Sequence, residues 1–378
     1  MSRPHPLLSF EVDTSGQDTS SKDDSFDSDV RKSWYHYLPL CLLLFLMVAP
    51  HPSLLIVLVN HYLFTLNKPI VCVIHTLIIY TLEFLAFCSL MVCVARDPGP
   101  VHFDASDHDS TDQREDMGLA EALMTMGNTD DDCSPEKFCR KCWVPKPERA
   151  HHCSICGRCV LKMGEFIHFR QLRWRLNILD HHCPWLGAKC VGYRTYPAFV
   201  HFLTCITAFS AYTTIISISA FWWSFNNPLL VLDQSTPVHE LLLAAAGVIF
   251  TLVVGSFWVY HVYLITTNQT TVEAISPFLL LRYIPPLPAS MKLSDPPMED
   301  ELSYNQRRVV RDAHNSVRMY DVGWRRNWAQ VFGWSKPRGW IYLLLIGGEG
   351  NSDGRSFPRN PRSQVMLSQL AARLEKEA

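Results

Sequence analysis

Charged side chains are scarce in this chain. They make up 19% of its 378 residues, whereas an ordinary soluble domain carries about a quarter. The charges nearly cancel, and a formal net charge of −2 excludes a protein that binds nucleic acid through bulk positive charge. The composition also excludes a collagen, a coiled coil and a chain that is disordered throughout. Hydrophobic residues make up 48%, and their clustering, together with the deficit of charge, points to membrane spans.

Long apolar runs occur four times, at residues 38–66, 69–94, 196–223 and 241–267. Each run exceeds the roughly 20 residues that a helix needs to cross a bilayer. A single run could be a buried core helix, but four runs of this length argue against that reading. The run 38–66 contains Pro50 and Pro52 in its interior, so we expect its helix to be kinked or shortened there. The sequence therefore predicts an α-helical polytopic membrane protein with four spans.

Basic residues near the span ends set the predicted orientation. Arg31 and Lys32 precede the first span, Arg96 follows the second and Arg194 precedes the third, while the loop between the first two spans holds only Lys68. We therefore expect both termini and the central loop to face the cytosol. No signal peptide is visible, because the first apolar run begins only after Arg31 and Lys32. We expect an endomembrane protein of the endoplasmic reticulum, Golgi or vacuole.

Composition divides the chain into six predicted parts. Both terminal parts and the central loop are polar, and the central loop changes from acidic to basic along its length. The parts are a disordered tail (1–34), spans one and two (35–95), an acidic linker (96–136), a cysteine-rich domain (137–195), spans three and four (196–267) and a cytosolic tail (268–378).

Cysteine is concentrated in the central loop, which holds eight of the thirteen cysteines. The cytosol is a reducing compartment, so we expect the cysteines of this loop to be metal ligands and a reactive thiol instead of disulfides. Two cysteines separated by two residues can bind one zinc ion from a single turn. The pattern reads Cys139-x2-Cys142, then His151-His152-Cys153-x2-Cys156-x2-Cys159, then Asp180-His181-His182-Cys183-Pro184-Trp185, and ends at Cys190.

This order resembles the cysteine-rich domain of the DHHC protein S-acyltransferases, which are multi-span enzymes that palmitoylate cytosolic cysteines. Three further elements resemble the family at the expected places. Asp97-Pro98-Gly99 after span two is similar to its DPG element, and Thr270-Thr271-Val272-Glu273 after span four is similar to its TTxE element. Residues 327–333 (Asn-Trp-Ala-Gln-Val-Phe-Gly) resemble its aromatic and asparagine motif in the C-terminal tail.

The resemblance implies two structural Zn²⁺ ions and acyl-CoA, such as palmitoyl-CoA, as co-substrate. The first zinc would be bound by Cys139, Cys142, His152 and Cys159, and the second by Cys153, Cys156, His182 and Cys190. The implied partners are cytosolic or membrane-associated proteins with acceptor cysteines, and the lipid bilayer; nucleic acid is not among them.

The resemblance also implies the catalytic groups. Cys183 would be the nucleophile that accepts the acyl group from acyl-CoA and passes it to a substrate cysteine. His181 would remove the thiol proton, and Asp180 would orient the imidazole and stabilise its cation.

Three departures from the family pattern stand out. Residues 164–179 are an insert between a zinc ligand and Asp180, and we interpret them as an unspliced in-frame intron of 48 nucleotides. We therefore expect the chain as given to be impaired. The spacing from Cys183 to Cys190 is one residue longer than usual, which weakens the assignment of Cys190. Thr195 stands where asparagine is expected, and we expect this change to affect packing more than chemistry.

Three alternative functions remain open from the sequence. A membrane-anchored zinc module, such as a RING-like ubiquitin ligase, would use the same cysteines but leave no free nucleophile. A channel or transporter would require more intramembrane charge than Glu83 alone provides. A catalytically impaired DHHC-like protein is the third alternative. We expect His75 and His201, which lie within spans, to be hydrogen-bonded core residues.

Overall fold

The computed structural model describes most of the chain from residue 34 onward. The predicted N-terminal tail, most of the acidic linker, the insert 164–179 and Asp180, His181 and His182 lie outside the described residues. The described residues are 34–99, 138–139, 141–142, 144–161, 183–187, 189–288, 293–294, 296–333, 339–348, 350 and 354–377.

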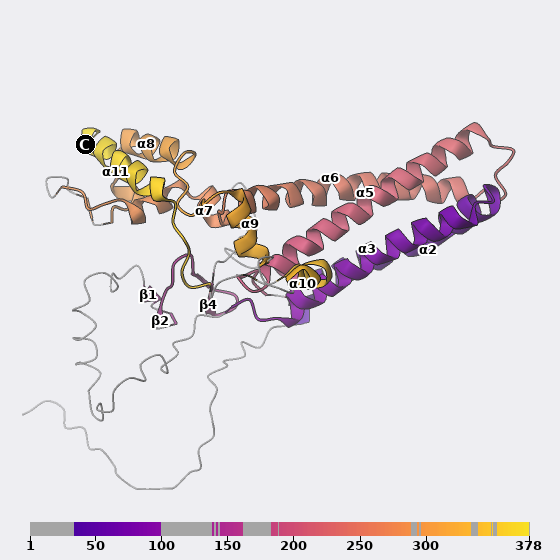
Figure 1. Ribbon diagram of the computed structural model, residues 1–378, viewed down its shortest axis with the longest axis horizontal. Coiled ribbons are helices and arrows are strands. Elements are labelled where there is room, and N and C mark those ends of the chain that lie inside the picture. Colours follow the sequence, from indigo (N-terminus) through magenta and orange to yellow (C-terminus); the bar gives the residue numbers. More distant parts are fainter. Residues whose placement is uncertain are drawn as a thin grey trace, which may run out of the picture. The chain divides into compact units, whose positions relative to one another are not determined.

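Four helices in the described part are long and apolar enough to cross a membrane, as the sequence predicts. They cover Trp34–Thr65, Pro69–Ala95 (α3), Tyr196–Asn226 (α5) and Thr236–Thr266 (α6). A helix pairs its backbone N–H and C=O groups with one another, which a bilayer requires. The protein is therefore an integral membrane protein with a mostly helical fold (Figure 1).

The first span is divided where the prolines occur. It comprises a 3₁₀ turn, η1 (Trp34–Tyr37), then α1 (Leu38–Val48), α2 (His51–Ile56) and a π-helical segment, η2 (Val57–Thr65). A turn at residues 49–50 separates α1 from α2, because Pro50 and Pro52 lack the backbone N–H that would continue the helix. The predicted interruption is confirmed.

Helix α5 is the central helix of the bundle. Half of its most apolar stretch is buried, against 17–28% for the other three spans, and it packs along both α3 and α6 (Figure 1). Gly247 in α6 permits close approach, because a Cβ there would lie 2.3 Å from the Thr214 hydroxyl of α5. Small residues at helix interfaces have this role in membrane proteins.

Several polar side chains inside the bundle are paired between spans. His61 Nδ1 lies 2.9 Å from Glu240 Oε1, and both side chains are almost completely buried. Glu83, the one acidic residue of span two, lies 2.5 Å from His51. His75 hydrogen-bonds the Tyr212 hydroxyl at 2.7 Å and His201 hydrogen-bonds Ser89 at 2.6 Å, so the prediction that these two histidines are satisfied is confirmed.

The described residues of the cysteine-rich region form two short antiparallel ladders and one 3₁₀ turn. Strand β1 (Phe138–Cys139) pairs with β2 (Val144–Pro145), and β3 (His151–Cys153) pairs with β4 (Arg158–Val160). After span four the elements are α7 (Thr271–Ile275), η8 (Pro277–Tyr283), η9 (Glu299–Glu301), α8 (Tyr304–His314), α9 (Trp324–Phe332), α10 (Gly339–Ile346) and α11 (Pro361–Lys376). The apolar stretch within α10 is too short to span, as predicted.

Candidate active site and metal centres

The first Cys/His cluster joins the two short ladders. Cys139 ends β1 and Cys142 lies in the turn before β2, while His152 and Cys159 come from β3 and β4. The Nδ1 atom of His152 lies 3.0 Å from the Cys142 sulfur, 3.5 Å from the Cys139 sulfur and 3.9 Å from the Cys159 sulfur. The structure thus brings together all four residues predicted for the first metal.

The second cluster contains Cys153, Cys156 and Cys190, and the sulfurs of Cys156 and Cys190 are 3.3 Å apart. Its predicted fourth ligand, His182, lies outside the described residues. The unusual spacing before Cys190 is accommodated by a 3₁₀ turn, η7 (Pro184–Leu186), followed by Gly187 in the left-handed region with φ of 64°. Glycine adopts this conformation without steric cost.

The first cluster has the dimensions of a tetrahedral metal site, and the three sulfurs of the second lie within 4.8 Å of one another. Zinc bonds of about 2.0–2.3 Å hold a nitrogen and a sulfur ligand about 3.5 Å apart, and two sulfurs slightly farther apart. The measured separations of 3.0–3.9 Å in the first cluster bracket this value. Thiol and imidazole donors are also the set that zinc prefers.

Strand alternation explains how neighbouring residues serve different clusters. His152 is directly opposite Cys159 in the β3–β4 ladder, so both side chains point to the same face. The next residue, Cys153, points to the opposite face and joins the second cluster. The His-His-Cys run therefore places two metal sites on either side of one hairpin.

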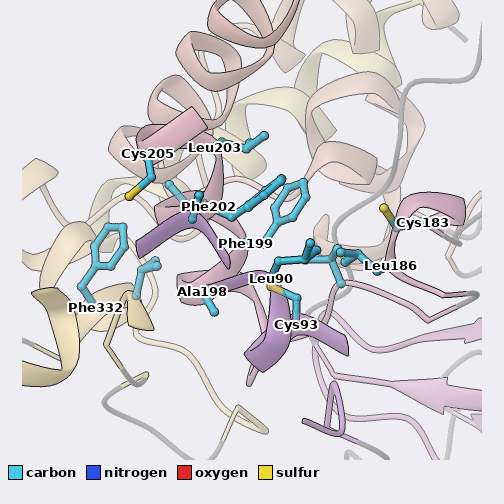
Figure 2. Packing of buried hydrophobic residues seen from close by; sticks show 14 of the residues in the cluster. Leu90, Cys93, Cys183, Leu186, Ala198, Phe199, Phe202, Leu203, Cys205 and Phe332 are labelled. Carbon is cyan, nitrogen blue, oxygen red and sulfur yellow. The ribbon is translucent and has the colours of Figure 1, made fainter. Parts of the chain in front are cut away.

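Cys183 lies apart from both clusters, at the edge of the apolar core of the bundle. Its side chain is buried beside Leu186, in a cluster that includes Leu90, Phe199 and Phe202 (Figure 2). Its backbone N–H donates to the Lys189 carbonyl at 3.3 Å, which closes the η7 turn. Burial raises the pKa of the Cys183 thiol to about 12, although backbone N–H groups of the turn lower this pKa in part. The neutral thiol therefore predominates in this environment.

The η7 turn also contacts the start of the first span. A Cβ at Gly187 would lie 3.3 Å from Leu40 and 3.5 Å from Tyr37. Cys183 is therefore held between the cysteine-rich domain and the ends of spans one, two and three.

The segment Asp97-Pro98-Gly99 packs against the cysteine-rich domain, although its residues fall within the range predicted as linker. Asp97 forms an ion pair with Arg158 at 2.8 Å, and the Gly99 carbonyl accepts the Leu161 N–H at 3.0 Å. Gly192 must be glycine, because a Cβ there would lie 2.3 Å from the Pro98 carbonyl oxygen. The segment thus joins the end of span two to the residues that flank both clusters.

The sequence analysis missed the residue that connects this domain to span four, Arg149. Its guanidinium is fully buried and donates two hydrogen bonds of 2.8 Å to the Glu273 carboxylate. It also donates to Asn268 and lies 4.3 Å from the centre of the Tyr320 ring. The only sequence signal was the position of Arg149 directly before the Ala-His-His-Cys run.

The spacing of the TTxE-like element has a structural reason. Thr270 caps α7, accepting the Glu273 N–H, while the Glu273 carboxylate accepts the Thr270 N–H at 2.8 Å. This capping box fixes the carboxylate in the position where it binds Arg149.

Asn327 in α9 has a similar role at the end of span four. It is completely buried, and its amide donates to the Thr266 carbonyl and to the Asp321 carboxylate, both at 2.8 Å. It therefore satisfies a carbonyl that the end of α6 leaves without a helical partner.

Comparisons with known proteins agree with this geometry. The fold and site define a polytopic membrane protein with a metal-binding Cys/His domain between its second and third spans. Residues 132–277 match the family described as DHHC palmitoyltransferase. This match covers the cysteine-rich domain and spans three and four, and it confirms the resemblance recognised in the sequence.

Curated relatives carry the same description. The chain is 40% identical to palmitoyltransferase pfa3 of Emericella nidulans over 151 residues, which cover 40% of this chain and 26% of the relative. It is 36% identical to palmitoyltransferase pfa3 of Aspergillus fumigatus over 200 residues (53% and 32%). It is 30% identical to palmitoyltransferase ZDHHC15A of Danio rerio over 229 residues (59% and 51%). The matched stretch thus spans about half or less of these relatives' length.

Proposed function

We propose that the protein is a protein S-palmitoyltransferase that forms an acyl-enzyme on Cys183. The observation that carries the proposal is that the metal-type clusters use every described cysteine of the domain except one. Among the described cysteines between residues 138 and 190, six belong to the two metal-type clusters, and Cys183 alone does not. A thiol that no metal requires remains available as a nucleophile.

The reaction has two thioester exchanges. The Cys183 sulfur attacks the acyl carbonyl of acyl-CoA, the bond to the CoA sulfur breaks, and CoA leaves as a thiol. The sulfur of a substrate cysteine then attacks the same carbonyl, which releases Cys183. His181 accepts the thiol proton in each attack and returns it to the leaving sulfur, and Asp180 orients the His181 ring.

The two clusters have a structural role in this proposal. Cys139, Cys142, His152 and Cys159 would hold one zinc, and Cys153, Cys156, His182 and Cys190 the other. Bound zinc supplies cross-links that order a small domain, and neither ion takes part in acyl transfer. The ligand residues flank the Cys183 turn and so fix its position.

The apolar surroundings of Cys183 support a long-chain acyl group as cargo. The cluster around it combines residues of all four spans with residues of the η7 turn and α9 (Figure 2). A long acyl chain is stabilised by about 0.8 kcal/mol for each methylene that leaves water. We infer that the tail lies among the spans and that the acceptors are cysteines of proteins at the membrane surface.

The proposed orientation places both termini and the cysteine-rich domain in the cytosol of an endomembrane system. In this proposal the chain keeps the six parts predicted from its composition, with the boundaries given in the sequence analysis. Protease protection of sealed vesicles that carry tags at each end would test the orientation. Both tags should be cleaved without detergent, and protection of either tag would contradict it.

Incubation of the purified chain with labelled palmitoyl-CoA tests the activity. We expect covalent label that neutral hydroxylamine releases, because hydroxylamine cleaves thioesters. A second version without residues 164–179 should accept label faster. If neither version takes up hydroxylamine-sensitive label, the protein is a zinc-binding interaction module or an inactive relative, and the proposal fails.

A further inference from the structure

The C-terminal part of the chain returns to the cysteine-rich domain. We call Gly350 and residues 354–360 the C-terminal strap. It lies outside the residues 132–277 that match the family, and it leads directly into α11. Its contacts concentrate on residues that flank the two metal-type clusters.

Two glycines of the strap lie against one tyrosine. A Cβ at Gly350 would lie 2.5 Å from the Tyr193 hydroxyl, and a Cβ at Gly354 would lie 2.7 Å from the Tyr193 ring. Tyr193 follows Cys190 by three residues, and its N–H donates to the Leu161 carbonyl at 2.9 Å. The strap therefore covers the stretch that links the second cluster to span three.

Phe357 of the strap contacts the buried Arg149 side chain. Its ring centre lies 5.0 Å from the Arg149 guanidinium and 6.1 Å from both the Tyr193 and the Tyr320 rings. The Arg149 guanidinium thus lies against two aromatic rings, Tyr320 and Phe357, which are also in edge contact with each other. Contacts of this kind are strongest where water is excluded.

Arg359 adds an ion pair to the residue next to Arg149. Its guanidinium contacts the Glu148 carboxylate, and both side chains are partly exposed, at 48% and 30%. Two residues of the domain, Glu148 and Arg149, are therefore contacted by two residues of the strap.

Helix α11 anchors the strap. Asn360 caps the helix, and its N–H donates to the Met319 carbonyl at 2.7 Å. Three leucines of α11 are buried in a core shared with α8, η8 and residues of the cysteine-rich domain: Leu367, Leu370 and Leu374. The strap is consequently fixed at its far end and not a loose tail.

We propose that the strap is part of the catalytic module and that Phe357 and Arg359 are positioning residues. They hold the turn at Glu148 and Arg149, and through it the metal-binding hairpin, against the exit of span four. The consequence for acyl transfer rests on the proposed function, whereas the effect on the domain's mobility does not.

Hydrogen exchange and self-acylation of the full chain test this inference together. Phe357→Ala should speed exchange of backbone amides in residues 144–161 by at least about tenfold, because a buried ring is lost. Arg359→Glu should speed it by about threefold to fivefold, and the double variant Glu148→Arg/Arg359→Glu should restore it. Val365→Ala is the matched control, since Val365 lies on the exposed face of α11. The maximal rate of self-acylation should fall with the exchange, at unchanged KM for acyl-CoA and unchanged zinc content.

Restoration of both rates in the charge-swapped variant distinguishes positioning from general loss of fold. Exchange in Phe357→Ala and Arg359→Glu equal to that in Val365→Ala would overturn the inference. Faster exchange with an unchanged acylation rate would overturn it as well. Absence of label in every variant, wild type included, would count against the proposed function, and the exchange rates would then decide alone whether the strap holds the domain.

Discussion

The membrane bundle and the cysteine-rich domain are stabilised by different means. The spanning segments are 27 to 32 residues long. Most of their backbone groups are hydrogen-bonded within the helix, and their side chains pack against neighbouring spans. In the part that the structure describes, the cysteine-rich domain has strands of two or three residues, and the core among its own residues consists of Cys153, Val160 and Cys190 with two partly buried neighbours. So little apolar burial cannot offset the entropy of ordering the chain. The order of this domain must come from metals and from contacts with the rest of the protein.

Those external contacts differ in strength. Arg149 is completely buried where it meets Glu273, whereas the ion pair of Asp97 with Arg158 is about 40% exposed on both sides. Charge-assisted bonds gain strength as water is excluded, and exposed pairs contribute little. The connection to span four should therefore matter more than the connection to span two.

The largest difference between the two regions should appear on loss of a metal ligand. Cys142→Ala should lose one zinc per chain and unfold residues 139–161, because structural zinc contributes on the order of 10 kcal/mol to such a domain. The helical signal in circular dichroism should stay near that of wild type. Metal analysis and limited proteolysis measure the effect, and retention of two zinc ions would show that the ligand assignment is wrong.

Loss of the buried arginine should be the next largest effect. Arg149→Ala leaves Glu273 without its partner and should destabilise the cytosolic part by about 3–5 kcal/mol. Arg158→Ala is the matched control and should cost at most about 1 kcal/mol. Chemical denaturation in detergent compares the two variants. Equal effects would contradict the ranking of the two connections.

A change inside the bundle should leave the cysteine-rich domain unaffected. Glu240→Gln weakens the buried contact with His61 and should cost about 1–3 kcal/mol. The variant should melt at a lower temperature with its zinc content and its hydrogen exchange in residues 144–161 unchanged. A loss of zinc in this variant would show that the two regions are less independent than their structures indicate.

The smallest effect on stability should come from removing the insert. Deleting residues 164–179 shortens a loop from twenty-two residues to six, a gain of only about 1 kcal/mol in loop entropy. We nevertheless expect faster self-acylation, because the insert directly precedes Asp180 and catalytic groups must be held to roughly 0.5 Å. Equal rates would show a tolerated loop. Separately, a mature transcript that retains all 48 nucleotides would disprove the interpretation as an intron.

Local patterns in the sequence predicted much of this molecule. Apolar runs gave the four spans, and the spacing of Cys139, Cys142, His152 and Cys159 predicted a cluster that the structure brings together. Such features depend on residues close in sequence. The ion pair between Arg149 and Glu273 was missed because the two residues lie 124 positions apart in the sequence. The sequence around either residue gives no indication that it contacts the other.

The same limit applies to the bundle and the tail. The sequence showed that Glu83 is a charged residue within a span, but it did not show that His51 is its partner. That contact depends on how spans one and two pack together, which the pattern of apolar residues does not specify. The strap could not be predicted, because residues 350–360 carry no motif and gain meaning only from their contact with Tyr193 and Arg149.

The central claim is that Cys183 carries the acyl group while the other cysteines of the domain bind metal. Labelling of Cys183→Ser with palmitoyl-CoA, combined with metal analysis of the same sample, tests it most directly. We predict no hydroxylamine-sensitive label and the same two zinc ions per chain as in wild type. Label that persists in this variant would remove Cys183 from the role of nucleophile, and loss of zinc would show that its sulfur is a ligand.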